Sequence, residues 1–160
     1  MFFGRGRVSP PVVRPLKAYR AQECARLHAA GFAHPWSAHE VAALIAASST
    51  LAAAALDPVS GRMRGFVLAR LAADEAEVLT IAVDPTARRR GVGRALLEAN
   101  LHQAANAGAR AMFLEVDEDN APALALYKRF GFIQVGRRTG YYRRNDGARA
   151  TAIIMRKALR

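Results

Sequence analysis

The chain has 160 residues, of which 52% are hydrophobic and 23% are charged, and it contains a single cysteine. This composition suits one globular domain and excludes a disordered chain, a disulfide framework and a zinc site built from cysteines. The net charge of +11 favours anionic partners such as nucleic acid or phosphorylated cofactors, although solubility alone would also explain it. Without an apolar run of 18 residues or a signal-peptide segment, we expect a cytoplasmic protein with no membrane partner.

Hydrophobic periodicity predicts strands that alternate with helices and then close the chain. Pro15 cannot donate a ladder hydrogen bond, so its strand suits a sheet edge. Ser37 and Glu40 form a capping box, which predicts the start of a helix. The alanine-rich stretch before the turn at 57–61 has helical propensity, but the turn favours the first arm of a hairpin. The predicted order is strand 12–16, helix 18–30, a helix from 38 through 45, strands 51–56, 65–71 and 77–83, helix 93–107, strand 111–116, helix 121–130, and strands 132–135 and 152–155.

This order predicts a single α/β domain with a mixed sheet. We expect the domain to span residues 12–160. Residues 1–11, which are rich in Gly, Arg and Pro, are expected to form a loose extension.

The most informative stretch is LTIAVDPTARRRGVGRA at residues 79–95, where a buried strand leads through a short loop into a helix. Free amides at a helix N-terminus bind anions, and Gly91 and Gly93 have no Cβ to obstruct a phosphate. The arginines at 88–90 add positive charge at the rim. The stretch therefore predicts a pyrophosphate cradle, the alternative being an ordinary basic helix cap with glycines for tight packing. It is neither a Walker loop nor a complete dinucleotide fingerprint.

A second stretch contains two candidate catalytic residues. Glu115 lies inside an apolar strand, where a carboxylate is costly unless it is partnered or faces a cleft. Tyr127 follows the apolar Leu126 on the next helix, and its hydroxyl could point toward the end of that strand. The alternative for Glu115 is an outward-facing position on the strand. The alternative for Tyr127 is an aromatic side chain of the core. Cys24 is expected to be a small core residue.

Together these stretches resemble the GNAT superfamily of acetyl-CoA-dependent N-acetyltransferases. The family's Arg-x-x-Gly-x-Gly loop corresponds to Arg88, Gly91 and Gly93, and its Asn-x-x-Ala-x-x-Leu-Tyr-x-x-x-Gly-Phe pattern to residues 120–132. The resemblance implies a largely antiparallel central sheet flanked by helices. It also implies acetyl-CoA as cosubstrate and no metal.

The resemblance implies a role for each matching residue. Glu115 would be the general base, and Tyr127 the acid that protonates the departing thiolate. The strand backbone at 81–83 would bind the pantetheine arm, and the loop with the start of the helix would hold the pyrophosphate. The residues expected to bind the cofactor are Ile81, Ala82, Val83, Arg89, Arg90, Gly91, Val92, Gly93, Arg94 and Asn120.

Within the superfamily, the segments at 34–37 and 114–116 are most similar to the RimI group, the ribosomal-protein-alanine N-acetyltransferases. The resemblance implies a protein N-terminal α-amine as acceptor, namely the N-terminal alanine of a small-subunit ribosomal protein. A lysine side chain or a small amine is the alternative acceptor, and a basic nucleic-acid-binding module is the alternative function. The arginines lack interleaved aromatic residues, so no specific nucleic-acid readout is expected. Trp36 would either line the acceptor site or pack as a hydrophobic staple before Ser37.

Overall fold

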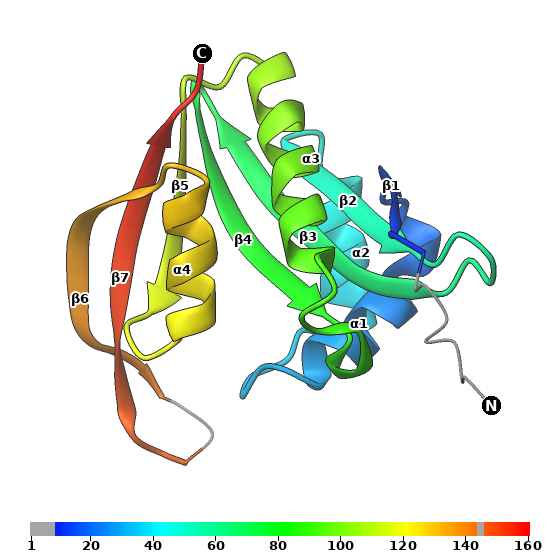
Figure 1. The fold of residues 1–160 in the computed structure, drawn as a ribbon, viewed down its shortest axis with the longest axis horizontal. Coiled ribbons are helices and arrows are strands. Elements are labelled where there is room, and N and C mark those ends of the chain that lie inside the picture. The colour runs from blue at the N-terminus through cyan, green and yellow to red at the C-terminus, as the bar shows by residue number, and fades with distance from the viewer. Residues whose placement is uncertain (1–8, 144–145) are drawn as a thin grey trace, which may run out of the picture.

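The computed structural model describes residues 9–143 and 146–160, which form one seven-stranded sheet with helices on both faces (Figure 1). The expectation for residues 1–8 of the N-terminal extension lies outside the described residues. In chain order the elements are β1 (Val12–Pro15), the 3-10 helix η1 (Ala18–Arg20), α1 (Ala21–Ala29), α2 (Ala38–Ala46), β2 (Thr50–Leu56), β3 (Met63–Ala72), β4 (Glu75–Val83), the 3-10 helix η2 (Pro85–Ala87), α3 (Val92–Asn106), β5 (Ala111–Asp117), α4 (Ala121–Arg129), β6 (Ile133–Arg143) and β7 (Arg149–Ala158).

The strands lie in the order β1-β2-β3-β4-β5-β7-β6, and β4–β5 is the one parallel pair among neighbours that are otherwise antiparallel. This confirms the predicted mixed, largely antiparallel sheet. The parallel pairing is short, because only residues 75–77 of β4 pair with residues 111–113 of β5. Beyond this point the two strands diverge, as the centre of Figure 1 shows. The sheet therefore opens in its middle.

Helices α3 and α4 lie on the front face of the sheet in Figure 1, and α1 and α2 lie behind β2–β4. The front core joins buried side chains of α3, such as Leu97, to Met112 and Leu114 of β5. The rear core joins Cys24 to Phe66 and other apolar residues of the sheet. Burying a side chain of this size contributes roughly 1.5–3 kcal/mol. The front core contains residues of both β4 and β5, so it joins the strands on the two sides of the opening.

Most predicted elements are confirmed. The strand that contains Pro15 lies at the sheet edge, and both hydrogen bonds of the Ser37–Glu40 capping box are present. The alanine-rich stretch is β2, which pairs with β3 through residues 50–56. Its helical propensity is overridden because its small side chains, buried at 53–55, let helices pack closely on the sheet. Cys24 is a fully buried core residue, as expected, and burial raises the pKa of its thiol to about 12.

The two last strands are longer than predicted. We expected strands at 132–135 and 152–155, whereas β6 extends to Arg143 and β7 begins at Arg149. Residues 137–143 are largely polar and show no apolar alternation. Cross-strand hydrogen bonds, which local hydrophobicity does not report, extend this hairpin.

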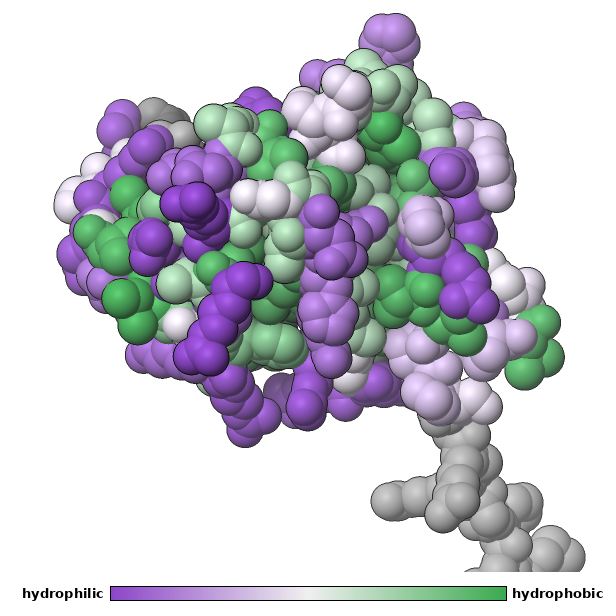
Figure 2. Space-filling model, turned by 90° about the horizontal axis from the view of Figure 1, so that it is seen from above, coloured by the Kyte–Doolittle hydropathy of each residue, from purple (hydrophilic) through white to green (hydrophobic). Residues whose placement is uncertain are grey.

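Figure 2 shows the molecule from above, relative to the view of Figure 1. On this face, hydrophilic and hydrophobic side chains are interspersed. None of the described helices has the length and hydropathy needed to cross a membrane.

Candidate active site

A pocket of about 830 Å³ lies where β4 and β5 diverge. Both predicted catalytic residues, Glu115 and Tyr127, line it. Its wall combines both strands, the start of α4 and the loop between α1 and α2. The lining residues are Gly31, Phe32, Ala33, His34, Val78, Leu79, Thr80, Ile81, Leu114, Glu115, Val116, Asp117, Asp119, Asn120, Pro122, Ala123 and Tyr127.

The edge of β4 that faces β5 is open along the pocket. After residue 77, no strand in the described ranges pairs with this edge. On its other edge β4 has a bulge at Leu79, because Leu68 pairs with Thr80 and Ala69 with Val78. An open strand edge presents N–H and C=O groups that an extended chain can pair with. This is the geometry that the predicted backbone contacts of residues 81–83 require, and of these residues Ile81 also lines the pocket.

Asp84 fixes the loop that follows β4. Its buried carboxylate accepts hydrogen bonds from the amide and the hydroxyl of Thr86, at 2.9 and 2.8 Å, and pairs with Arg62 at 3.4 Å. The Asp84 amide donates to the Arg64 carbonyl at 2.8 Å. Asp84 is not among the predicted site residues, although Asp before Pro is a recognised turn signal. Asp84 thereby sets where the loop begins relative to the pocket.

The loop then turns into α3 through left-handed backbone. Arg89 and Gly91 have φ angles of +61° and +77°. Alternation of this kind forms concave nests of amide groups that bind anions. Among the residues that the structure describes, no side chain caps α3. The amides of Val92, Gly93 and Arg94 lie in its first turn, where no intrahelical acceptor exists. The predicted cradle therefore has unsatisfied donors at the expected place.

The two glycines of the loop differ in their surroundings. A Cβ on Gly91 would meet nothing within 4 Å, so this residue faces open space. A Cβ on Gly93 would lie 3.7 Å from Leu126 and 3.9 Å from Val83. Gly93 therefore allows α3 to pack closely against α4, which is the alternative role given above for the glycines of the loop. Gly91 is the position where an approaching phosphate would meet bare backbone.

The arginines of the loop point in different directions. The Arg88 guanidinium would lie 3.9 Å from a Cβ on Gly31, beside the α1–α2 loop. Arg90 lines a separate pocket of about 240 Å³ together with Asp57 and Arg64. Arg89 and Arg94 are exposed.

Glu115 is partnered, as its place in an apolar strand led us to expect. Its Oε1 lies 3.4 Å from Nε of Arg138, and its side chain is 26% exposed. The neighbouring Leu114 and Val116 pack into the front core, so strand alternation turns Glu115 to the rear face. The carboxylate thus faces the pocket from the side opposite to α3 and α4.

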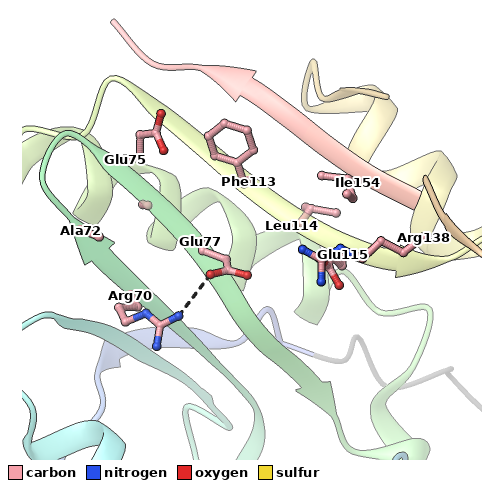
Figure 3. Close-up of a pocket in the computed structure, with 10 residues that line it drawn as sticks. Arg70, Ala72, Glu75, Glu77, Phe113, Leu114, Glu115, Arg138 and Ile154 are labelled. Atoms are coloured by element: carbon pink, nitrogen blue, oxygen red, sulfur yellow. Dashed lines mark hydrogen bonds and ion pairs between the residues drawn. The ribbon is translucent and has the colours of Figure 1, made fainter. Parts of the chain in front are cut away.

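Glu115 also borders a groove of about 280 Å³ on the rear of the sheet (Figure 3). Figure 3 shows Glu75 and Glu77 of β4 beside Phe113 and Glu115 of β5, with Arg70 and Glu77 paired at 3.3 Å. Because Leu114 and Glu115 line both hollows, the groove and the pocket meet at these two residues.

Tyr127 is both a core aromatic residue and a residue of the pocket wall. Its ring packs against the front core and meets Phe132 edge to face, with ring centroids 5.9 Å apart. The same residue lines the pocket. Burial raises the pKa of its phenol to about 12, so the hydroxyl keeps its proton throughout the neutral range. Tyr127 can therefore donate a proton at this site.

We expect Tyr127→Phe to lower kcat by about 10- to 100-fold, because one proton donor is lost while the ring packing remains. Affinity for acetyl-CoA, the cosubstrate that the family resemblance implies, should stay within about twofold when it is measured by calorimetry. Wild-type activity should not decline up to about pH 10 through ionisation of this phenol, since its pKa is about 12. Tyr19→Phe, at a highly exposed tyrosine, is the control. Equal losses of affinity and turnover would indicate a packing role instead.

Asn120 holds the start of α4. It is the N-cap of this helix, and its side-chain oxygen accepts a hydrogen bond from the Ala123 amide at 3.2 Å. Asn120 also lines the pocket. The cap uses one of the two acceptor sites of this oxygen, so the second site and the amide nitrogen are available for a contact with a cofactor.

His28 organises the α1–α2 loop, and the sequence analysis missed this role. The side chain is stacked between Phe32 and Trp36, with ring centroids 4.1 and 4.6 Å away. Its Nδ1 accepts a hydrogen bond from the Trp36 amide at 3.1 Å. Trp36 packs against the rear core, which fits the staple interpretation, and it is not among the residues that line the pocket. A lone histidine on a helix gives no ligand spacing, so only the fold reveals this contact.

We expect folding stability to decline below about pH 6.5 through His28. Burial lowers the pKa of His28, so the unfolded chain takes up this proton first as the pH falls. Stability is therefore full above the unfolded pKa and decreases by at most about 1.4 kcal/mol per pH unit toward the folded pKa. Urea unfolding at pH 5.5 and 7.5 measures the effect.

The control for this prediction compares two variants. In His28→Gln, the difference in unfolding free energy between the two pH values should shrink. In His39→Gln, at an exposed histidine of α2, it should match that of the wild type. An unchanged pH dependence in His28→Gln would contradict the prediction.

Comparison with known proteins places the chain in a family. Residues 21–132 match the model of the acetyltransferase (GNAT) family. The chain belongs to this family. It is 43% identical over 96 residues to the [ribosomal protein bS18]-alanine N-acetyltransferase of Escherichia coli K12, over 60% of this chain and 64% of that protein. The chain thus matches somewhat less than two thirds of the length of this curated relative.

Solved structures agree over a longer range. The crystal structure of the Escherichia coli ribosomal-protein-S18-alanine N-acetyltransferase superposes with a TM-score of 0.84 and 32% identity, over 93% of this chain and 94% of that one. The structure of Arabidopsis thaliana NAA60 in complex with acetyl-CoA has a TM-score of 0.81 at 22% identity, over 92% of this chain and 98% of that one. The first match confirms the predicted fold, and the second shows the same fold in a protein with bound acetyl-CoA.

Proposed function

We propose that this chain transfers the acetyl group of acetyl-CoA to a protein N-terminal α-amine. The proposed acceptor is the N-terminal alanine of a small-subunit ribosomal protein, which would place the activity in the cytoplasm. The catalytic domain would span residues 12–160. The observation that carries this proposal is the pocket between the diverging ends of β4 and β5, with Glu115 and Tyr127 in its wall.

Three features of β4 and of the loop and helix that follow it support acetyl-CoA as the cosubstrate. The open edge of β4 offers backbone groups to an extended pantetheine arm. The uncapped first turn of α3 offers amides to the pyrophosphate, and Gly91 leaves room for it. The exposed Arg89 and Arg94 add positive charge nearby. The open edge of β4 is followed along the chain by the start of α3. One elongated ligand can therefore place its pantetheine arm on the strand and its pyrophosphate at the helix.

The site supports direct transfer to an amine. The thioester supplies the acetyl group, and the acceptor nitrogen forms a bond to its carbonyl carbon as the carbon–sulfur bond breaks. Glu115 accepts the proton that the nitrogen loses, directly or through one water. A backbone amide of β4 stabilises the charge that develops on the carbonyl oxygen. Tyr127 donates its phenolic proton to the departing sulfur. Glu115 then releases its proton to water and Tyr127 takes one up from water, which restores both side chains for the next turnover.

An α-amine suits a site with one modest base. Its pKa is about 8, so about a tenth is neutral at pH 7, whereas lysine with a pKa of about 10.4 is neutral far more rarely. This difference favours an N-terminal amine. The similarity to the Escherichia coli bS18-alanine N-acetyltransferase supports alanine as its residue.

The proposal is tested by offering acetyl-CoA with three acceptors: an alanine-starting peptide, an N-blocked peptide with one lysine, and a small polyamine. We expect kcat/KM for the alanine-starting peptide to be at least about tenfold higher than for the others, with the label located on the α-amine by mass spectrometry. A higher kcat/KM for the lysine peptide or the polyamine would refute the proposed acceptor and identify a different one. Incubation with dissociated ribosomal proteins then identifies the natural one.

A further inference from the structure

Thr80 has a buried hydroxyl for which the fold supplies no partner. The residue is 5% exposed, and its Oγ1 makes no hydrogen bond to any part of the chain that the structure describes. A buried hydroxyl without a partner costs free energy, because it gave up hydrogen bonds to water on folding. Thr80 lines the same pocket as Glu115. The unpaired Thr80 hydroxyl destabilises the free protein and lies in a binding pocket. We therefore expect a bound ligand to supply its hydrogen-bond partner.

The bulge in β4 decides which way Thr80 faces. Val78, two residues earlier, packs into the front core, and regular alternation would place Thr80 on that same face. The bulge at Leu79 instead pairs Thr80 with Leu68, whose side chain belongs to the rear core. Directly paired residues of antiparallel strands share a face, so Thr80 lies on the rear face. Strand alternation places Glu115 on this rear face as well.

The attacking nitrogen needs two hydrogen-bond acceptors. A neutral primary amine has two N–H groups and one lone pair, and the lone pair must point at the acetyl carbon. Where the bound amine is out of contact with bulk water, both N–H groups then need hydrogen-bond acceptors in the pocket. Glu115 provides one. A hydroxyl oxygen has two acceptor sites, so Thr80 can provide the other.

We propose that Oγ1 of Thr80 accepts a hydrogen bond from the acceptor amine and so aims its lone pair at the acetyl group. This inference rests on the proposed amine acetylation at this site. Glu115 takes one amine proton during transfer, and the N–H that remains on the amide product stays bonded to Thr80. The ligand class is a primary amine, and the role of Thr80 is to bind and orient it.

Thr80→Val and Thr80→Ser test this role. Valine has the shape of threonine without the hydroxyl, and serine keeps the hydroxyl. With saturating acetyl-CoA, we expect Thr80→Val to lower kcat/KM for the acceptor by about tenfold, the effect of one hydrogen bond, and Thr80→Ser to stay within about threefold of wild type. Acetyl-CoA affinity should remain within about twofold. Thr50→Val, which removes a hydroxyl from β2, is the matched control and should retain wild-type kinetics.

A second readout separates binding from folding. Thr80→Val removes an unpaired buried hydroxyl, so we expect its melting temperature to rise by about 2–4 °C while activity falls. Wild-type kinetics in Thr80→Val, or a Thr80→Ser variant as slow as Thr80→Val, would overturn the inference. The rates are measured on whichever of the three acceptors the wild type uses. A wild type that prefers lysine or the polyamine would therefore refute the alanine acceptor while still deciding the role of Thr80.

Discussion

Gly91→Asp is expected to lose at least about 100-fold in acetyl-CoA affinity. A Cβ at this position points into open space at the start of α3, where the pyrophosphate is proposed to bind. A carboxylate about 5 Å from one phosphate charge would repel it by about 3 kcal/mol at an effective dielectric constant of about 20. This corresponds to a factor of more than 100 in Kd. Calorimetry with intact acetyl-CoA measures the loss directly.

Gly61→Asp is the matched control for this variant. Gly61 lies in the turn between β2 and β3, its φ is +72°, and a Cβ there also meets nothing within 4 Å. Both variants therefore place the same side chain on left-handed backbone in open space, and only Gly91 lies beside the proposed phosphate site. We expect Gly61→Asp to bind acetyl-CoA like the wild type. Retained affinity in Gly91→Asp would refute the cradle and the roles built on it.

Glu115→Gln is expected to lower kcat by about 100-fold or more, because the amide cannot take the proton from the attacking nitrogen. The side chain keeps its shape, and the proposed cofactor contacts lie on β4, the loop, α3 and α4. Acetyl-CoA affinity should therefore stay within about twofold. Steady-state kinetics with saturating acetyl-CoA give kcat, and calorimetry gives the affinity.

Glu118→Gln controls for the loss of an ion-paired carboxylate. Glu118 pairs with Arg137 at 2.8 Å, much as Glu115 pairs with Arg138, but it is not among the residues that line the pocket. This variant should keep wild-type turnover. An unchanged rate in Glu115→Gln would exclude Glu115 as the base and direct attention to another acceptor of the proton.

Much of the local structure could be predicted because local chemistry decides it. The Ser37–Glu40 capping box, the Asn120 cap and the Gly108 helix end, with a φ of +92°, are each set within a few residues. The two motifs that carry the family resemblance also lie in short stretches. They were sufficient to predict the fold and to name Glu115 and Tyr127, which the structure then brings into one pocket.

Several site features could not be predicted because they depend on contacts between distant segments. Arg88 and Arg90 are the same residue type in one loop, so the sequence does not distinguish their surroundings. In the fold, Arg88 lies beside the α1–α2 loop, whereas Arg90 lines a pocket with Arg64. The stacking of His28 requires the chain to return through Trp36. The face that Thr80 occupies depends on a bulge, which exists only in the register of β3 with β4.

The sequence by itself determined the elements, the single mixed sheet, and the kind of chemistry that its two motifs support, because capping, periodicity and motif spacing act over short distances along the chain. The tertiary structure alone decided where the sheet opens, which partner Glu115 has and which buried hydroxyl is left without one. These outcomes depend on strand register and on packing between residues far apart in the chain. A pairing that stops after three residues leaves no mark in either strand's own sequence.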